Sequence, residues 1–127
     1  MDDRASGQPV GAAHFTVDVD GREVGCSAVT GLGFESRDQR VTPVTLRLAA
    51  GSDPALWTWA REPTPRTVTI TLLDLRREPL ARYVLRGAHP ERWTGPVLDA
   101  LSGEVALEEL VLSAEALDIE RVGPASR

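Results

Sequence analysis

Cysteine and histidine are the residues of this sequence that could act as nucleophile and base. The chain has one cysteine, Cys26, and two histidines, His14 and His89. A thiolate paired with an imidazole needs an oxyanion-stabilising group beside it, and no motif for one is present. No spacing brings the three residues together, and the two distant histidines lack metal-ligand spacing. We therefore predict no catalytic, cofactor-binding or metal-binding residues, and a protein that is not an enzyme.

Three tryptophans could form a stacking surface for bases or sugars. Trp57 and Trp59 lie on a predicted helix. Trp93 lies beside a Gly-Pro turn, in a loop that Pro90, Gly95 and Pro96 predict. Because a tryptophan buries a large area, packing in the core is the better interpretation. The pair Arg76-Arg77 lies in a predicted turn, where it is either a solvated tip or a contact with a partner.

The composition predicts one globular domain that does not recognise nucleic acid directly. A chain of 127 residues with 42% hydrophobic residues can bury a core without a disulfide or a metal. The net charge of -5 argues against phosphate binding, which requires a basic face. No apolar run reaches the length of a membrane helix and no secretory signal pattern appears, so we expect a cytoplasmic protein with no membrane segment.

Charge is distributed unevenly along the chain. Between Arg61 and Arg92 there are seven arginines against four acids, whereas Asp99 to Glu120 contains seven acids and no base. A chain with a basic and an acidic portion can attract copies of itself, although two solvated faces of different charge give the same pattern. All fourteen cationic residues are arginine, which loses less than lysine on burial in an interface.

Alternating apolar and polar residues predict a mainly β fold. Strands are expected over residues 14–19, 23–29, from 34 onward, 44–48, 67–73, 80–88, 105–114 and 117–122. Asp20-Gly21 supplies the turn of the first hairpin. About seven short strands with few residues between them predict an antiparallel β-sandwich or a partly closed barrel.

One short helix is expected to flank the sheet. Asp53 can cap it and Pro54 suits its first position. A helix of this length cannot form a core of its own. We expect flexible tails over residues 1–11 and 123–127, and a single β domain over residues 12–122.

Six short motifs follow one another along the chain. They are FTVDVDG at 15–21, VTGL at 29–32, LWTW at 56–59, the strand and its following aspartate at 68–74, WTGPVLDA at 93–100 and EVALEELVL at 104–112. In this order the motifs resemble the phage tail tube protein family (gp19-like) of contractile phage tails and contractile injection systems. Each motif alone is weak, and the combination is fairly specific.

The resemblance implies a structural subunit with a tail-tube-like β-sandwich that assembles into hexameric rings. Stacked rings form a hollow tube in members of the family. The implied partners are further copies of the chain and other tube, sheath, baseplate or cap proteins. The implied location is the cytoplasm, in a phage-tail-like particle.

One segment departs from the family pattern. Typical members have a long inter-ring hairpin between the second motif and the helix, whereas here only Gly33 to Ser52 separates them. The shortened hairpin fits a tube-type ring component, but it also fits an adaptor, initiator or terminator that does not polymerise. A free monomeric β-sandwich that binds another molecule is the alternative of a different class.

A subunit interface is expected in this same segment. Open strand edges between Phe34 and Leu48 can continue a sheet across subunits, and a ring closes such edges. The predicted interface residues are Phe34, Glu35, Arg37, Arg40, Thr45 and Arg47.

Overall fold

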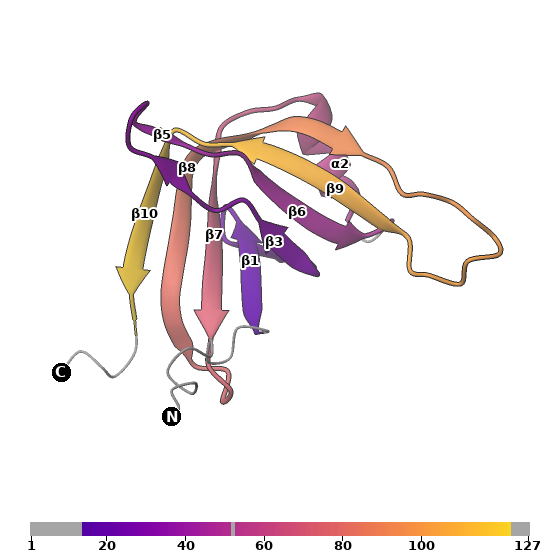
Figure 1. Ribbon diagram of the computed structural model, residues 1–127, viewed down its shortest axis with the longest axis horizontal. Helices are drawn as coiled ribbons and strands as arrows, with labels where there is room; N and C mark the ends of the chain where they lie inside the picture. Colours follow the sequence, from indigo (N-terminus) through magenta and orange to yellow (C-terminus); the bar gives the residue numbers. More distant parts are fainter. Residues whose placement is uncertain (1–13, 52, 123–127) are drawn as a thin grey trace.

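The computed structural model describes residues 14–51 and 53–122, which form ten strands and the helix α2 (Figure 1). The elements are β1 Phe15–Val19, β2 Arg22–Val24, β3 Ala28–Thr30, β4 Phe34–Glu35, β5 Arg40–Val41, β6 Val44–Ala49, α2 Pro54–Arg61, β7 Arg66–Leu73, β8 Pro79–Thr94, β9 Leu107–Ser113 and β10 Ala116–Arg121. The tails predicted over 1–11 and 123–127 lie outside the described residues.

Eight of these strands form one antiparallel sheet that is folded into two layers. The order is β2-β1-β7-β8-β9-β6-β3, and β10 pairs with β8 beside this path. The first half of β8 pairs with β7 and β10 in one layer, and its second half pairs with β9 in the other. In the described part of the chain β2 and β3 do not pair with each other, so the sheet is not a closed barrel. The mainly β, antiparallel fold with a flanking helix is confirmed, with more strands than the seven or so expected.

Strand β8 passes from one layer to the other at a bend near Gly87. Gly87 has a φ of +63°, a left-handed conformation that glycine adopts without strain. A Cβ atom at this position would lie 2.8 Å from the Glu115 side chain. Opposite the bend β9 ends and β10 begins, and the Glu115 N–H donates to the Arg86 carbonyl over 2.9 Å. Together β8, β9 and β10 form one long bent ribbon (Figure 1).

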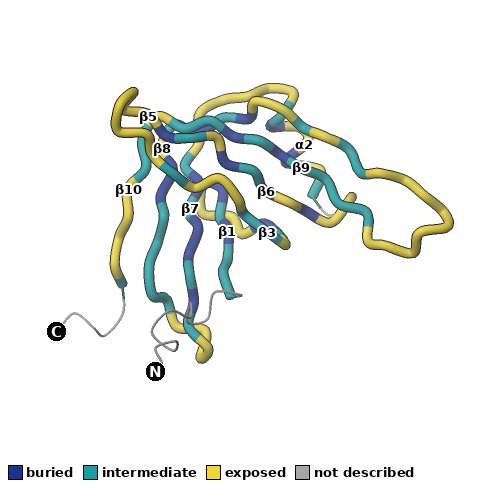
Figure 2. Tube along the Cα trace, viewed as in Figure 1, coloured by how far each residue is buried: buried dark blue, intermediate teal, exposed yellow. Residues whose placement is uncertain are grey.

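The core lies between the two layers and extends to the buried face of α2. Alternation directs Val17 and Val19 of β1, and Leu46 and Leu48 of β6, into this core. Figure 2 shows the buried stretches on the strands, whereas the connections between them and much of β10 are exposed. The remaining buried members of the core are Val24, Val41, Val44, Leu56, Trp59, Val68, Ile70, Leu85, Ala88, Leu110 and Leu112.

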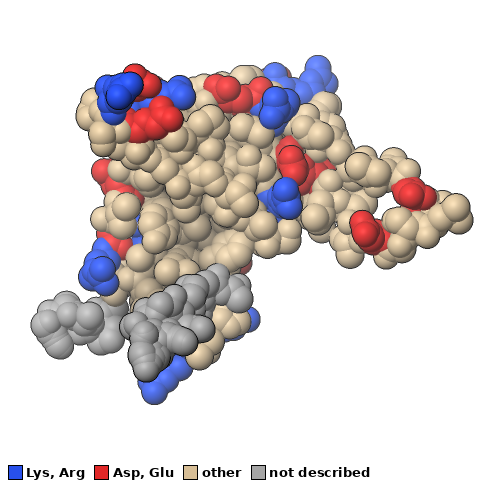
Figure 3. All heavy atoms as spheres, viewed as in Figure 1, with Lys and Arg blue, Asp and Glu red and all other residues tan. Residues whose placement is uncertain are grey.

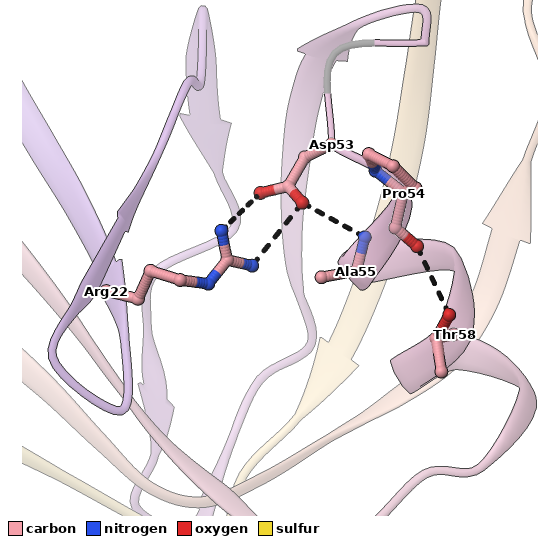
Figure 4. Close-up of polar contacts among 5 residues, drawn as sticks. All are labelled: Arg22, Asp53, Pro54, Ala55 and Thr58. Carbon is pink, nitrogen blue, oxygen red and sulfur yellow. Dashed lines mark hydrogen bonds and ion pairs between the residues drawn. The ribbon is translucent and has the colours of Figure 1, made fainter.

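Helix α2 begins where the sequence predicts. The Asp53 carboxylate accepts the Ala55 N–H over 3.0 Å and binds the Arg22 guanidinium with contacts of 3.1 and 3.4 Å (Figure 4). The Thr58 hydroxyl donates to the Pro54 carbonyl over 3.4 Å. Because Arg22 lies on β2, the helix cap also ties the start of α2 to an edge of the sheet.

Two strand predictions need correction. The strand expected over 23–29 is divided into β2 and β3, so Cys26 lies in the loop between them. The loop expected around Trp93 belongs instead to β8, which continues through Pro90. Proline is tolerated there because this half of β8 pairs with one strand only among the described residues, and the register shifts directly after Pro90.

Candidate assembly surfaces

Cysteine and histidine, the reactive residues of the chain, lie in separate segments. The half-buried Cys26 thiol donates to the Ala28 carbonyl over 3.2 Å. Burial raises the pKa of the Cys26 thiol, which is opposite to the shift that activates a nucleophile. His89 lies on β8 opposite Ser113, and His14 precedes β1. Among the described residues, no three His, Cys, Asp or Glu side chains are grouped so that they could hold a metal ion.

Four of the six predicted interface residues lie on the β4–β5 hairpin, which forms a small sheet of its own. Its two-residue strands pair Phe34 with Val41 and Glu35 with Arg40. The Arg40 Nε lies 3.1 Å from Glu35 Oε1, so these two charges neutralise each other. Phe34 is 51% exposed, and Arg37 is exposed at the turn. Aromatic residues and arginine are enriched in protein interfaces, which makes this tip a candidate contact.

The base of the hairpin is fixed to the body. Val41 is buried in the core, and Thr42 donates from its hydroxyl to the Gly31 carbonyl and from its N–H to the Gly33 carbonyl. Gly31 has a φ of +90°, and a Cβ atom there would lie 2.4 Å from the Pro43 carbonyl oxygen. This position therefore requires glycine. The glycine of the VTGL motif thus has a structural role, because it lets the chain that enters the hairpin pass close to Pro43, directly before β6.

Thr45 and Arg47, the other two predicted interface residues, lie on β6. This strand pairs with β9 on one side and with β3 on the other. The expectation that Phe34 to Leu48 supplies open edges is therefore wrong for β6. Its two partner strands come from distant parts of the chain. The alternation of apolar and polar residues within β6 does not reveal that they pair with it. Both side chains point away from the core, and the Arg47 Nε lies 3.1 Å from Glu109 Oε2.

Open edges occur elsewhere in the sheet. Strand β10 has six residues, and β8 is its only strand partner in the part of the chain that the structure describes. Figure 1 shows β10 at one side of its layer. The edge strands β2 and β3 have only three residues each. An unpaired edge can accept a strand from another chain. Sequence reasoning missed the open edge of β10, although charged residues along 118–121 are a known sign of an exposed edge.

The three tryptophans divide between the core and the surface. Trp59 is buried, and its indole N–H donates to the Thr64 carbonyl over 2.7 Å. Trp57 is 46% exposed and packs edge to face on Trp93 at a centroid distance of 4.8 Å. The expectation that all three pack in the core is therefore wrong for Trp57.

None of the helical structure in the described residues has the length and apolar character that crossing a bilayer requires.

The sequence of this chain matches a known protein family. A family model described as T4-like virus tail tube protein gp19 matches residues 37–118. That segment begins in the turn of the β4–β5 hairpin and includes α2 and the strands from β5 to the first part of β10. No curated protein sequence matches the chain.

Several solved structures share the fold. A chain of an extracellular contractile injection system, from the PVC sheath-tube complex in its extended state, is 22% identical with a TM-score of 0.76, covering 93% of this chain and 95% of that one. A chain of the anti-feeding prophage cap, the AFP tube terminating cap, is 20% identical with a TM-score of 0.78 and coverages of 95% and 97%. Hcp1 from Flavobacterium johnsoniae is 11% identical with a TM-score of 0.65 and coverages of 83% and 93%.

Proposed function

This chain belongs to the T4-like virus tail tube protein gp19 family, and from this premise we propose that it is a tube-type ring subunit of a phage-tail-like contractile injection system. The family match over residues 37–118 carries the proposal. The fold it shares with a chain of a sheath-tube complex supports it. In this proposal copies close into a hexameric ring, stacked rings form a hollow tube, and the role is structural and not enzymatic.

The open edge of β10 supports ring formation. Its backbone groups on one side have no strand partner among the described residues, and a strand of a neighbouring copy can supply one. In a closed ring, the β10 edge of every copy then has a partner. The proposed subunit boundary also contains the β4–β5 hairpin and the outer face of β6, with Phe34, Glu35, Arg37, Arg40, Thr45 and Arg47.

Sheath, baseplate and cap proteins are the proposed partners of the assembled ring. The solved chains of similar fold come from assemblies that include a sheath-tube complex and a tube-terminating cap. We propose that the particle assembles in the cytoplasm and that the subunit works without a cofactor and without direct nucleic-acid recognition.

A second candidate is an adaptor, initiator or terminator that does not polymerise. The observation that favours it is the β4–β5 hairpin, whose two-residue strands are short for a contact between rings. The similar TM-scores of 0.76 to the chain of a sheath-tube complex and 0.78 to the cap do not separate the two roles.

The test is the molar mass of the purified protein over a concentration series, measured by light scattering after size exclusion, with negative-stain images of any large species. We expect rings or tubes, and we expect Phe34→Ser and Arg37→Glu to weaken them. Glu62→Gln at the end of α2 is the control and should assemble normally. A monomer at every concentration contradicts the ring subunit, and capture of that monomer on preformed tubes or baseplates then supports the adaptor.

A further inference from the structure

The loop between β8 and β9, residues 95–106, projects from the body and is here called the arm (Figure 1). Four of its apolar side chains are largely exposed: Val97 at 87%, Leu98 at 82%, Leu101 at 95% and Val105 at 75%. A soluble monomer rarely exposes a contiguous apolar group of this kind, and such groups mark interaction sites. The arm therefore carries side chains of the kind that proteins usually bury, but the rest of its own chain does not cover them.

The arm encloses a hollow that its own side chains leave open. Its volume is about 270 Å³, and its apolar wall includes Val97, Val105 and Leu107. Asp99 and Glu104 line the same hollow. Figure 3 shows an opening through the arm, with acidic side chains beside it. No arginine or lysine occurs between residues 95 and 106, so the hollow is both apolar and acidic.

The turn between β7 and β8, residues 74–78, has two arginines at its tip between Asp74 and Glu78, and it is here called the basic turn. Leu75 at its tip is 73% exposed. Arg76 and Arg77 follow it, and neither forms an ion pair within the described part of the chain. The Asp74 carboxylate fixes the turn by accepting the N–H groups of Arg76 over 2.8 Å and Glu78 over 2.9 Å. A fixed tip with one apolar and two cationic side chains loses little entropy on binding.

We infer that the arm of one copy receives the basic turn of a second copy of this chain. This inference rests on the proposed function and names a contact through which its copies assemble. Leu75 enters the apolar part of the hollow, and the two guanidinium groups bind the carboxylates of Asp99 and Glu104. The contact also explains the separation of basic and acidic residues along the sequence, because the basic turn and the arm lie in the two opposite portions.

Other exposed apolar groups suit the arm less well. Ile119 on β10 stands between Glu120 and Asp118, and the Asp118 carboxylate already binds the Arg86 guanidinium, so this position does not offer the arm two arginines beside an apolar tip. Phe34 lies beside Glu35, and the nearby Arg40 is already bound to that glutamate. Two arms also repel each other. A contact between different surfaces, repeated from copy to copy, can close a ring or extend a tube.

Disulfide trapping between two single-cysteine variants tests the contact, because every bond that forms must join two copies. Both variants carry Cys26→Ser, one with Val105→Cys in the arm and the other with Leu75→Cys in the basic turn. We expect a mixed disulfide under mild oxidation, identified by mass spectrometry. Val105→Cys mixed with Ile119→Cys is the matched control and should give at least tenfold less product. Equal trapping in the control mixture overturns the inference. A disulfide between two copies of the Val105→Cys variant, formed instead of the mixed disulfide, overturns it as well.

Charge reversal provides an independent readout. Glu104→Arg and Arg76→Glu should each raise the concentration needed for assembly at least tenfold, and the chain with both changes should return to within about threefold of the unaltered protein. Glu62→Arg is the control for reversing a charge elsewhere. If the unaltered protein assembles but shows neither rescue nor trapping, this inference fails and the ring proposal stands. A protein that stays monomeric at every concentration overturns both.

Discussion

Two connections between strands differ in how they are packed: the one that contains α2, between β6 and β7 and here called the corner, lies against the core, whereas the arm does not. In the corner, Asp53 caps the helix and binds Arg22, while Leu56 and Trp59 enter the core. In the arm, the apolar side chains are largely exposed and meet no such core. The comparison shows that apolar content alone does not make a connection part of the core. What decides is whether the neighbouring strands supply a surface that can cover it.

Removing the largest buried side chain of the corner should give the largest loss of stability. Trp59→Ala should lower the free energy of unfolding by about 3–5 kcal/mol, because it removes a buried ring and leaves a cavity. Urea denaturation followed by circular dichroism measures this loss. Trp57→Ala is the matched control, and its cost should be clearly smaller because that ring is half exposed. Equal costs for the two variants would show that the corner is not packed as described.

Two glycines with positive φ sharpen the comparison between the body and the arm. Gly31→Ala should cost about 1–3 kcal/mol or more, because strain at its φ of +90° adds to a 2.4 Å contact with the Pro43 carbonyl. Gly103 in the arm has a φ of +71° but nothing within 4 Å of an added Cβ atom. Gly103→Ala should therefore cost less than Gly31→Ala, about 1–2 kcal/mol, from local strain alone. The same denaturation measurement compares them, and a larger cost at Gly103 would contradict this account.

The helix cap should contribute a smaller amount. Asp53→Ala should cost about 1 kcal/mol, because it leaves the Ala55 N–H without its acceptor. Asp53→Asn keeps an acceptor oxygen and removes the charge that binds Arg22. That pair is partly exposed, so the asparagine variant should lose less than about 1 kcal/mol. Thermal unfolding of both variants separates the cap from the ion pair, and a greater loss for asparagine than for alanine would refute the assignment.

The smallest effect on stability is expected in the arm. Leu101→Ser should change the free energy of unfolding by no more than about 0.5 kcal/mol, because the leucine is already exposed in the monomer. The same variant should assemble less readily than the unaltered protein. Denaturation at low protein concentration and light scattering at high concentration measure the two properties separately. A large loss of monomer stability would mean that the arm is covered by its own chain.

Local patterns in the sequence predicted the strands and the helix start that are determined by residues within or directly beside the element. Alternation identified β1 and β7, and Asp53-Pro54 identified the start of α2. The loop expected at Pro90 was wrong because proline disrupts a strand only where its N–H is needed, and that depends on which sides of β8 are paired. The division of the strand expected over 23–29 likewise depends on the partners that β2 and β3 find elsewhere.

The candidate site was predictable in residue type but not in arrangement. The exposure of Phe34 and Arg37 agrees with a role at the surface, and that role stays a prediction. The edge position expected for Thr45 and Arg47 was wrong, because β3 and β9 come from distant segments to flank β6. The Gly-Pro turn predicted a loop at residue 95, but its projection from the body depends on how β8 and β9 leave the sheet.

Strand β8 runs for 16 residues from the end of the basic turn to the start of the arm. In an array joined through these two features, both points of attachment lie at the ends of one strand. A pull along the array is then carried from copy to copy by the covalent backbone of β8. The hydrogen bonds to β7 and β10 on one side of the bend near Gly87, and those to β9 on the other side, hold this backbone in the sheet against such a pull. Both points of attachment thereby belong to one hydrogen-bonded strand.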